Sequence, residues 1–143
     1  MMISTRGRYA LRVMLDLAEY GEGEYIPLKE VAERQEISLK YMEAIMGILT
    51  RNGLVEGQHG RGGGYRLSRG PDAYTVGDVL RLTETSLAPV ACLAGGAAPC
   101  RRAPQCRTLP MWTKLERMIT DYFDSISLAD LMEPAGRDIN ARL

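Results

Sequence analysis

The stretch HGRGGG, residues 59 to 64, constrains the fold more than any other feature of this 143-residue sequence, because four of its six residues are glycine. It separates two short strand-like runs, LVEGQ and YRLS. A glycine run breaks helices and strands, and between two such runs it is typical of the exposed tip of a β-hairpin. We therefore expect a two-stranded hairpin here, with a different kind of structure before it.

Three segments before the hairpin have the apolar spacing of amphipathic helices. The first runs from about Ser4 to Tyr20, and the second, PLKEVAERQ, begins at Pro27, which suits the first position of a helix. The third starts after Ser38, a natural N-cap, and stops at Gly53 in the C-terminal glycine position. The residues expected on the buried faces are Ala10, Val13, Met14, Leu17, Ala18, Leu28, Val31, Ala32, Leu39, Met42, Ile45, Met46 and Leu49.

This order of elements, with a glycine-tipped hairpin after the third helix, is that of a winged helix-turn-helix, in which the third helix enters the major groove of DNA. After the hairpin, Thr75 and Asp78 form the capping box of a further helix, TVGDVLRLTE. We predict a mainly α fold in which residues 1–85 form a winged helix-turn-helix DNA-binding domain with a two-stranded wing.

Exposed residues near the start of the third helix suit contact with DNA. Ser38, Lys40 and Tyr41 can bind phosphates or base edges there, where the helix dipole favours an anion. Glu43 can accept a hydrogen bond from the amino group of cytosine but repels the DNA backbone. We therefore expect Glu43 to select sequence and not to add affinity.

In the wing, His59 and Arg61 stand among glycines that let the backbone come close to a narrow minor groove. The stretch GRGGGY is no dinucleotide fingerprint, because Tyr65 replaces its last glycine and a strand follows it. The 18 basic residues are balanced by 18 acidic ones, so bulk charge does not draw the chain to nucleic acid. The alternative is that these basic residues are only solvated and the hairpin is only a turn.

Residues 86–110 lack helical spacing and contain four prolines and all three cysteines, Cys92, Cys100 and Cys106. An odd number of cysteines favours metal or redox chemistry over a disulfide framework. The spacers of seven and five residues match no zinc ribbon or ferredoxin motif. A flexible loop can still fold three sulfurs around one ion or cluster, and the alternative is three unligated thiols. Zinc would need a fourth ligand, and the one histidine lies in the wing.

Residues 111–133 are expected to form a long helix and a short terminal helix capped by Ser127 and Asp130. The long helix repeats large apolar residues in steps of three and four, a stripe that favours burial in a homodimer. The alternative is that it packs back on its own domain. Residues 134–143 are expected to be a flexible tail. The apolar residues of the long helix are Met111, Trp112, Leu115, Met118, Ile119, Tyr122, Phe123 and Ile126.

Two classes of protein are disfavoured by the sequence. No apolar run approaches the roughly 18 residues of a membrane span, and no secretory signal is present, so we expect a cytoplasmic protein without a membrane partner. With a single histidine in an exposed loop, no nucleophile and base pair can be assembled, so we expect no enzyme activity.

The sequence resembles the IscR-type winged-helix regulators, the Rrf-two family, which includes cluster-biogenesis regulators and nitric-oxide sensors. The resemblance lies in the blocks ISTRGRYALRVMLDLAEY, PLKEVAERQEISLKYMEAI, LTRNGLVEGQHGRGGGYRLSR, TVGDVLRLTETSLAPVAC and SISLADLM. It implies a homodimer formed through the long helix, an iron-sulfur cluster held by Cys92, Cys100 and Cys106, and DNA contacts from the helix and wing residues named above. It also implies that Glu43 discriminates between operator classes.

The sequence departs from the family pattern where a fourth cluster ligand is expected. Leu109 stands where some members place a histidine, and Arg8 stands where others place an aspartate of the partner's first helix. We predict a [2Fe–2S] cluster in preference to a [4Fe–4S] cluster, with an open fourth ligand; protein prepared in air can lack it.

The predicted function is a regulator that binds double-stranded palindromic operator DNA and whose binding responds, through the cluster, to iron-sulfur status, redox state or nitric oxide. Two alternatives remain at this point. One is a cluster-free regulator responding to thiol oxidation or zinc, and the other is a regulator that acts through a metabolic enzyme partner.

Overall fold

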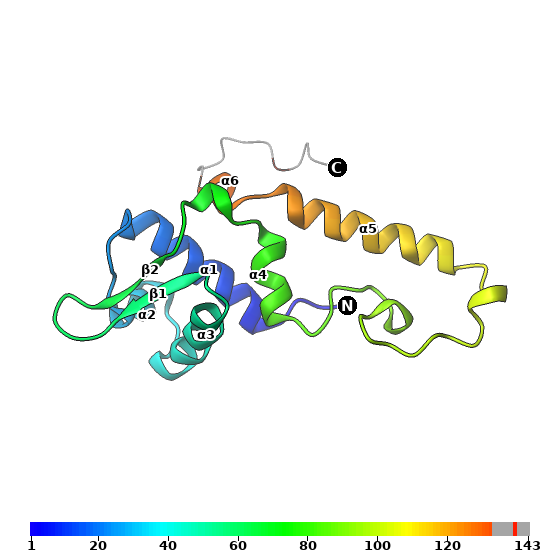
Figure 1. Ribbon diagram of the computed structural model, residues 1–143, viewed down its shortest axis with the longest axis horizontal. Helices are drawn as coiled ribbons and strands as arrows, with labels where there is room; N and C mark the ends of the chain where they lie inside the picture. The colour runs from blue at the N-terminus through cyan, green and yellow to red at the C-terminus, as the bar shows by residue number, and fades with distance from the viewer. Residues whose placement is uncertain (133–138, 140–143) are drawn as a thin grey trace.

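The computed structural model describes residues 1–132 and residue 139, which form a mainly helical fold with one two-stranded antiparallel sheet (Figure 1). In chain order the elements are α1 (Thr5–Gly21), α2 (Leu28–Gln35), α3 (Leu39–Arg51), β1 (Val55–Gln58), β2 (Gly64–Leu67), α4 (Val76–Thr83), α5 (Leu109–Ser125) and α6 (Leu128–Met132). Short 3-10 turns lie at Pro71–Ala73, Ala91–Leu93 and Ala103–Gln105. This order confirms the predicted fold class. The predicted tail, residues 134–143, lies outside the described residues except for residue 139.

Local capping chemistry fixes the helix ends that the sequence predicted. The Ser38 hydroxyl accepts a hydrogen bond from the Tyr41 N–H at 3.2 Å and so begins α3. Thr75 and Asp78 form the predicted capping box of α4, with reciprocal hydrogen bonds of 2.9 and 3.0 Å. Gly53 has φ +73°, the left-handed conformation expected just after a helix.

The core of the winged helix lies where α1, α2 and α3 meet, and apolar residues of the wing pack against it. Ten of the thirteen residues predicted to face inward are buried, and Met14, Ile45 and Leu49 are completely shielded from solvent. Ala18 and Leu28 are only partly buried, and Leu39 is exposed. Burying each such side chain contributes about 1.5–3 kcal/mol, so the three short amphipathic helices stabilise one another. The Tyr74 ring is also buried, and its hydroxyl donates to the Leu54 carbonyl at 2.7 Å.

The terminal helix α6 returns to this core. Leu128 is fully buried in the same cluster as Met14, and a single β-bridge joins Thr75 to Ser127. Ser127 and Asp130 cap α6 reciprocally at 2.9 and 3.0 Å, as the sequence predicted. The helix that follows α5 in the chain is therefore fastened to the winged helix.

Three details differ from the sequence prediction. Leu39 is 46% exposed, because it is the first residue of α3 and lies at the helix end that leaves the core. Pro27 is the N-cap of α2 and not its first helical residue. The long helix begins at Leu109, since Pro110 suits a first helical turn, and it ends before Ile126, which is extended.

The wing is tied to the helical part by its glycine run. Val55 pairs with Leu67 and Gln58 with Gly64 in an antiparallel ladder, and Tyr65 also bridges to Ile26 through hydrogen bonds of 2.8 Å. A Cβ at Gly64 would lie 2.1 Å from the Ile26 carbonyl oxygen. Glycine is thus required at this position for the hairpin to approach the strand segment before α2.

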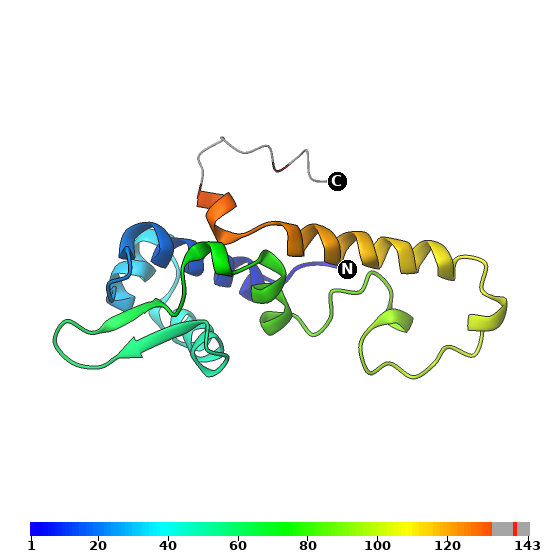
Figure 2. The ribbon, with the colours of Figure 1, turned by 45° about the horizontal axis from the view of Figure 1, so that its top comes forward.

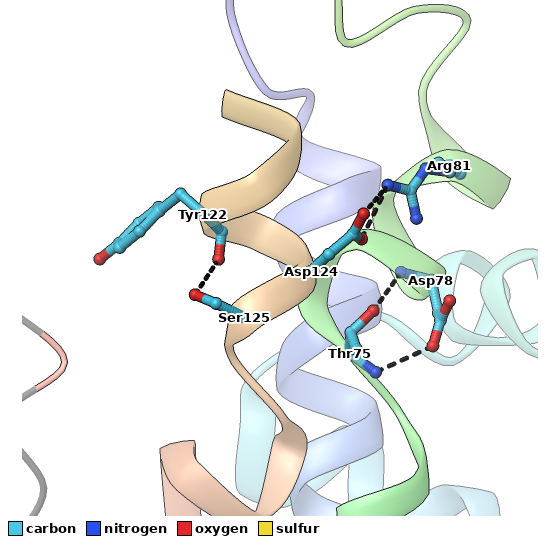
Figure 3. A network of polar contacts seen from close by, with 6 residues as sticks. All are labelled: Thr75, Asp78, Arg81, Tyr122, Asp124 and Ser125. Carbon is cyan, nitrogen blue, oxygen red and sulfur yellow. Dashed lines mark hydrogen bonds and ion pairs between the residues drawn. The ribbon is translucent and has the colours of Figure 1, made fainter. Parts of the chain in front are cut away.

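The C-terminal half of α5 rests on α4 through a compact polar joint (Figure 3). One guanidinium nitrogen of Arg81 contacts both carboxylate oxygens of Asp124 at 2.7 Å. A Cβ at Gly77 would lie 2.1 Å from an Asp124 oxygen, so glycine lets α5 come this close. Tyr122 and Phe123 add apolar contacts to a small cluster around Leu80 in α4.

The rest of α5 extends away from the winged helix, and the segment between α4 and α5 loops beyond its free end in both views (Figures 1 and 2). No residue within α5 is buried. Over the described part of the chain, no helix is both long and apolar enough to cross a membrane.

Candidate nucleic-acid interface and thiol loop

The four residues predicted to read DNA from the third helix lie on the exposed side of its first turns. Ser38, Lys40, Tyr41 and Glu43 are all exposed. Ser38 uses its oxygen as the α3 cap, which leaves its O–H proton free to donate. The Tyr41 ring packs edge-on against the Tyr9 ring of α1, with centroids 5.6 Å apart, and this contact restricts the orientation of the Tyr41 side chain.

Of the two wing residues predicted to contact DNA, His59 lies across a hollow from α3, whereas Arg61 is not among the residues that line it. His59 and Arg61 are exposed and make no hydrogen bond or ion pair within the described chain. Gly60 and Gly62 have φ of +90° and +75°, which side chains rarely adopt, so the loop needs both glycines. His59 and Glu43 line the same hollow of about 380 Å³, and the fold thus brings two predicted site residues together.

A buried carboxylate that the sequence reasoning missed fixes the angle between α1 and α2. Asp16 is only 1% exposed and accepts hydrogen bonds from Arg34 at 2.7 and 3.0 Å and from Gln35 at 2.9 Å. The hydrogen bond to Asp16 raises the pKa of Arg34 despite the opposing effect of burial. The available signal was an acid on the apolar face of α1, with a basic residue in the last turn of α2 to pair with it.

The three thiols lie in an extended loop with little packing. Cys92 and Cys100 are exposed, Cys106 is half-buried, and all three are free. Residues 85–108 include no buried residue. The described residues hold no cluster of three or more His, Cys, Asp or Glu side chains that could bind a metal, so the loop as it stands does not gather the thiols.

The surroundings of Cys106 favour ionisation of its thiol. Its sulfur lies 3.4 Å from the Thr108 hydroxyl, and this hydrogen bond, with a smaller contribution from Arg102, lowers the pKa of the thiol. Cys106 lines a hollow of about 510 Å³ with Arg102, Gln105 and Arg107. Three free thiols beside arginines are chemically suitable ligands for an iron-sulfur group. They would have to move closer to one another to hold one.

Glu84 joins the start of this loop to the start of α1. Its carboxylate accepts hydrogen bonds from the Ser4 N–H at 2.5 Å and the Ser4 hydroxyl at 2.6 Å. Burial raises the pKa of Glu84. The hydrogen bonds from Ser4 and Thr83 and the charge of Arg6 together lower this pKa by more than burial raises it, so the net shift is downward. Gly7 makes room, since a Cβ there would lie 3.0 Å from a Glu84 oxygen.

Comparison with known families decides what this arrangement of helices, wing and loop represents. A family model named Rrf2 and described as an iron-dependent transcriptional regulator matches residues 3–134. The chain belongs to the Rrf2 family. This confirms the resemblance found in the sequence, and it makes the protein an Rrf2 transcriptional regulator.

Individual Rrf2 relatives match over most of their length. The chain is 37% identical over 132 residues to the HTH-type transcriptional regulator IscR of Erwinia tasmaniensis, covering 92% of this chain and 79% of that protein. The corresponding IscR of Vibrio cholerae is 36% identical, with 92% and 75% covered.

Solved structures agree with the fold. The IscR structure from T. potens gives a TM-score of 0.72 at 35% identity, covering 92% of this chain and 86% of that chain. CymR, the global cysteine regulator of B. subtilis, gives a TM-score of 0.73 at 35% identity, covering 92% and 96%. DNA-binding regulation is the activity that these Rrf2 relatives support for the chain.

Proposed function

We propose that this Rrf2 regulator is a cytoplasmic homodimer that binds palindromic operator DNA and that an iron-sulfur cluster on Cys92, Cys100 and Cys106 controls the binding. The observation that carries the proposal is the position of the thiol loop. It leaves α4 of the winged helix, is fastened to α1 through Glu84 and Ser4, and leads into α5.

The DNA contacts are assigned to the exposed polar residues on α3 and the wing. Ser38, Lys40 and Tyr41 would bind phosphates and base edges at the N-terminus of α3, and Glu43 would select cytosine. His59 and Arg61 would enter the adjacent minor groove. Substitution of Lys40 should weaken binding to all duplexes alike, whereas Glu43→Ala should relax sequence preference with little loss of affinity.

The dimer is assigned to the free half of α5. Met111, Leu115 and Met118 are 53%, 37% and 50% exposed, and a monomer would leave this apolar face in water. Two copies related by a two-fold axis would also present two winged helices to a palindrome. In sedimentation experiments Met118→Asp should dissociate the dimer, and Lys29→Asp, a larger charge change at an exposed position of α2, should leave it intact. A dimer that persists in Met118→Asp would refute this interface.

The cluster is assigned to the three thiols, with α1 as the element that senses it. When bound, the cluster supplies a centre that reacts with oxygen, nitric oxide or a reductant. Arg101, Arg102 and Arg107 would offset its negative charge and favour the thiolate form of its ligands. Drawing the thiols together would pull on the loop that starts at Glu84, and the contact of Glu84 with Ser4 would pass this pull to the start of α1.

Spectroscopy on oxygen-free protein tests the cluster directly. The parent should be coloured and contain iron and sulfide, and Cys106→Ala should lose the visible absorption. Ser86→Ala, in the same loop but without a ligand role, is the matched control and should keep it. Colourless parent protein without iron after anaerobic preparation and reconstitution would remove the cluster from the proposal.

A cluster-free thiol regulator is the second candidate, and the lowered pKa of the half-buried Cys106 thiol favours it. Metal analysis of the same sample separates the two, since this candidate predicts oxidant-dependent DNA binding in metal-free protein and a zinc-responsive form would retain zinc. A regulator that acts through a metabolic enzyme partner predicts no binding to palindromic DNA by the protein alone under any redox condition.

A further inference from the structure

The hollow between α3 and the wing has features that the assigned DNA contacts do not explain. It holds about 380 Å³ and opens between the two elements that would enter the two grooves. Two glycines, Gly47 of α3 and Gly57 of β1, form part of its wall, and Arg51, Gln58 and His59 bring hydrogen-bond donors to it. None of these three side chains makes a hydrogen bond or ion pair within residues 1–132 or with residue 139.

The geometry of a DNA duplex determines what has to lie there. The major and minor grooves are separated by a sugar-phosphate backbone. When α3 lies in a major groove and the wing in the neighbouring minor groove, the strand between the grooves must cross the space between α3 and the wing. That space is this hollow.

We propose that the hollow is a phosphate-binding site for this crossing strand, with Arg51 as its main charged ligand, Gln58 as a further donor, and Gly47 leaving room for the backbone. The inference rests on the proposed DNA binding and adds residues to it. The Arg51 guanidinium lies over Gly47, since a Cβ at Gly47 would be 3.2 Å from one of its nitrogens. Arginine suits a phosphate because its planar fork donates two parallel hydrogen bonds.

Glu43 lines the same hollow, and its negative charge makes Arg51 more important for binding a phosphate there. Its carboxylate repels a phosphate, so the strand can approach only where Arg51 offsets that charge. The site therefore aligns the duplex, because a phosphate bound by Arg51 holds the base edges next to Glu43. Glu43 is one turn of helix from Gly47, which is one turn from Arg51, so the three share one face of α3.

The first test removes the charge of Arg51. Arg51→Gln and the control Arg69→Gln, an exposed arginine outside the hollow, are compared with the parent by fluorescence anisotropy between 50 and 200 mM salt. The probes are a duplex selected by the parent from random sequence and an unrelated duplex of equal length. Arg51→Gln should weaken both by at least about tenfold and lower the salt slope by about 1.8, about 0.9 for each of the two copies of Arg51 in the dimer, while Arg69→Gln changes neither.

The second test uses opposite effects on folding and binding. In Gly47→Ala the added methyl meets only the end of the flexible Arg51 side chain, and alanine favours a helix more than glycine does. The melting temperature should therefore stay the same or rise while affinity for both duplexes falls. A glycine with only a structural role would give no loss of affinity.

The outcomes separate this inference from the proposed function. Parent protein that binds neither duplex in any redox state overturns both. Parent protein that binds, with Arg51→Gln equal to Arg69→Gln in affinity and salt slope, overturns the phosphate site alone. Loss of binding by Arg51→Gln confined to the selected duplex would indicate a base contact and also overturns the phosphate site.

Discussion

In the winged helix Met14, Ile45 and Val79 are fully shielded from solvent, whereas residues 85–108 include no buried residue at all. The first region holds its shape through side chains of the chain itself. The thiol loop has turns and prolines but no core, so its shape depends on what joins its ends and on what its thiols bind. The winged helix has a packed core and lies next to a loop that has none. In such an arrangement a ligand that orders the loop can shift contacts made by the winged helix.

The largest expected effect comes from the packed region. Leu49→Ala should lower the free energy of unfolding by about 2–5 kcal/mol, because Leu49 is completely buried in the core and its removal leaves a cavity. Leu93→Ala makes the same chemical change in the thiol loop and should cost less than about 1 kcal/mol in iron-free protein. Urea denaturation measures both, and equal losses would break the contrast between the two regions.

The next effect concerns the buried Asp16 carboxylate, which binds Arg34 and Gln35 inside the winged helix. Asp16→Ala should cost about 2–3 kcal/mol, because it removes charge-assisted hydrogen bonds that hold α2 to α1 and leaves Arg34 with its longer ion pair to Glu30. Glu30→Ala removes the other acid near Arg34, 3.8 Å away and 58% exposed, and should cost under about 1 kcal/mol. A large loss for Glu30→Ala would show that exposed pairs matter more to this fold than the buried carboxylate.

A smaller effect is expected at the contact between Glu84 and Ser4, where the thiol loop meets the winged helix. Glu84→Gln should cost about 1 kcal/mol at pH 7, because an amide accepts the Ser4 hydrogen bonds more weakly than a carboxylate. Since the folded-state pKa of Glu84 is lowered from its ordinary 4.5, its stabilisation is present above that value and is lost as the pH falls through the folded-state pKa. Acid titration should therefore bring parent and variant together, and a gap that widens with acid would contradict this.

The sequence predicts the winged helix in detail because its signals are local. Ser38, Gly53 and the pair Thr75 and Asp78 each act within a few residues, and the structure has all of them where expected. The exposed positions of the α3 and wing residues also agree with expectation, although their contacts with DNA remain a prediction.

Features that depend on distant residues were not predictable in the same way. The pairing of Asp16 with Arg34 and the return of Leu128 to the core join segments that no local pattern connects. The arrangement of the cysteines is a different case, because residues 85–108 contain no core that could determine it. For the thiols, spacing predicted the chemistry of the donors and not their positions.

Operator affinity measured in four samples tests most directly whether the thiol loop controls DNA binding by the winged helix. Parent and Cys106→Ala are each prepared without oxygen, iron-loaded and iron-stripped, and titrated with the same selected duplex. Coupling of about 1–3 kcal/mol predicts a roughly 5- to 150-fold difference between the two parent samples and no difference between the two variant samples. Equal affinities in all four samples would contradict the account.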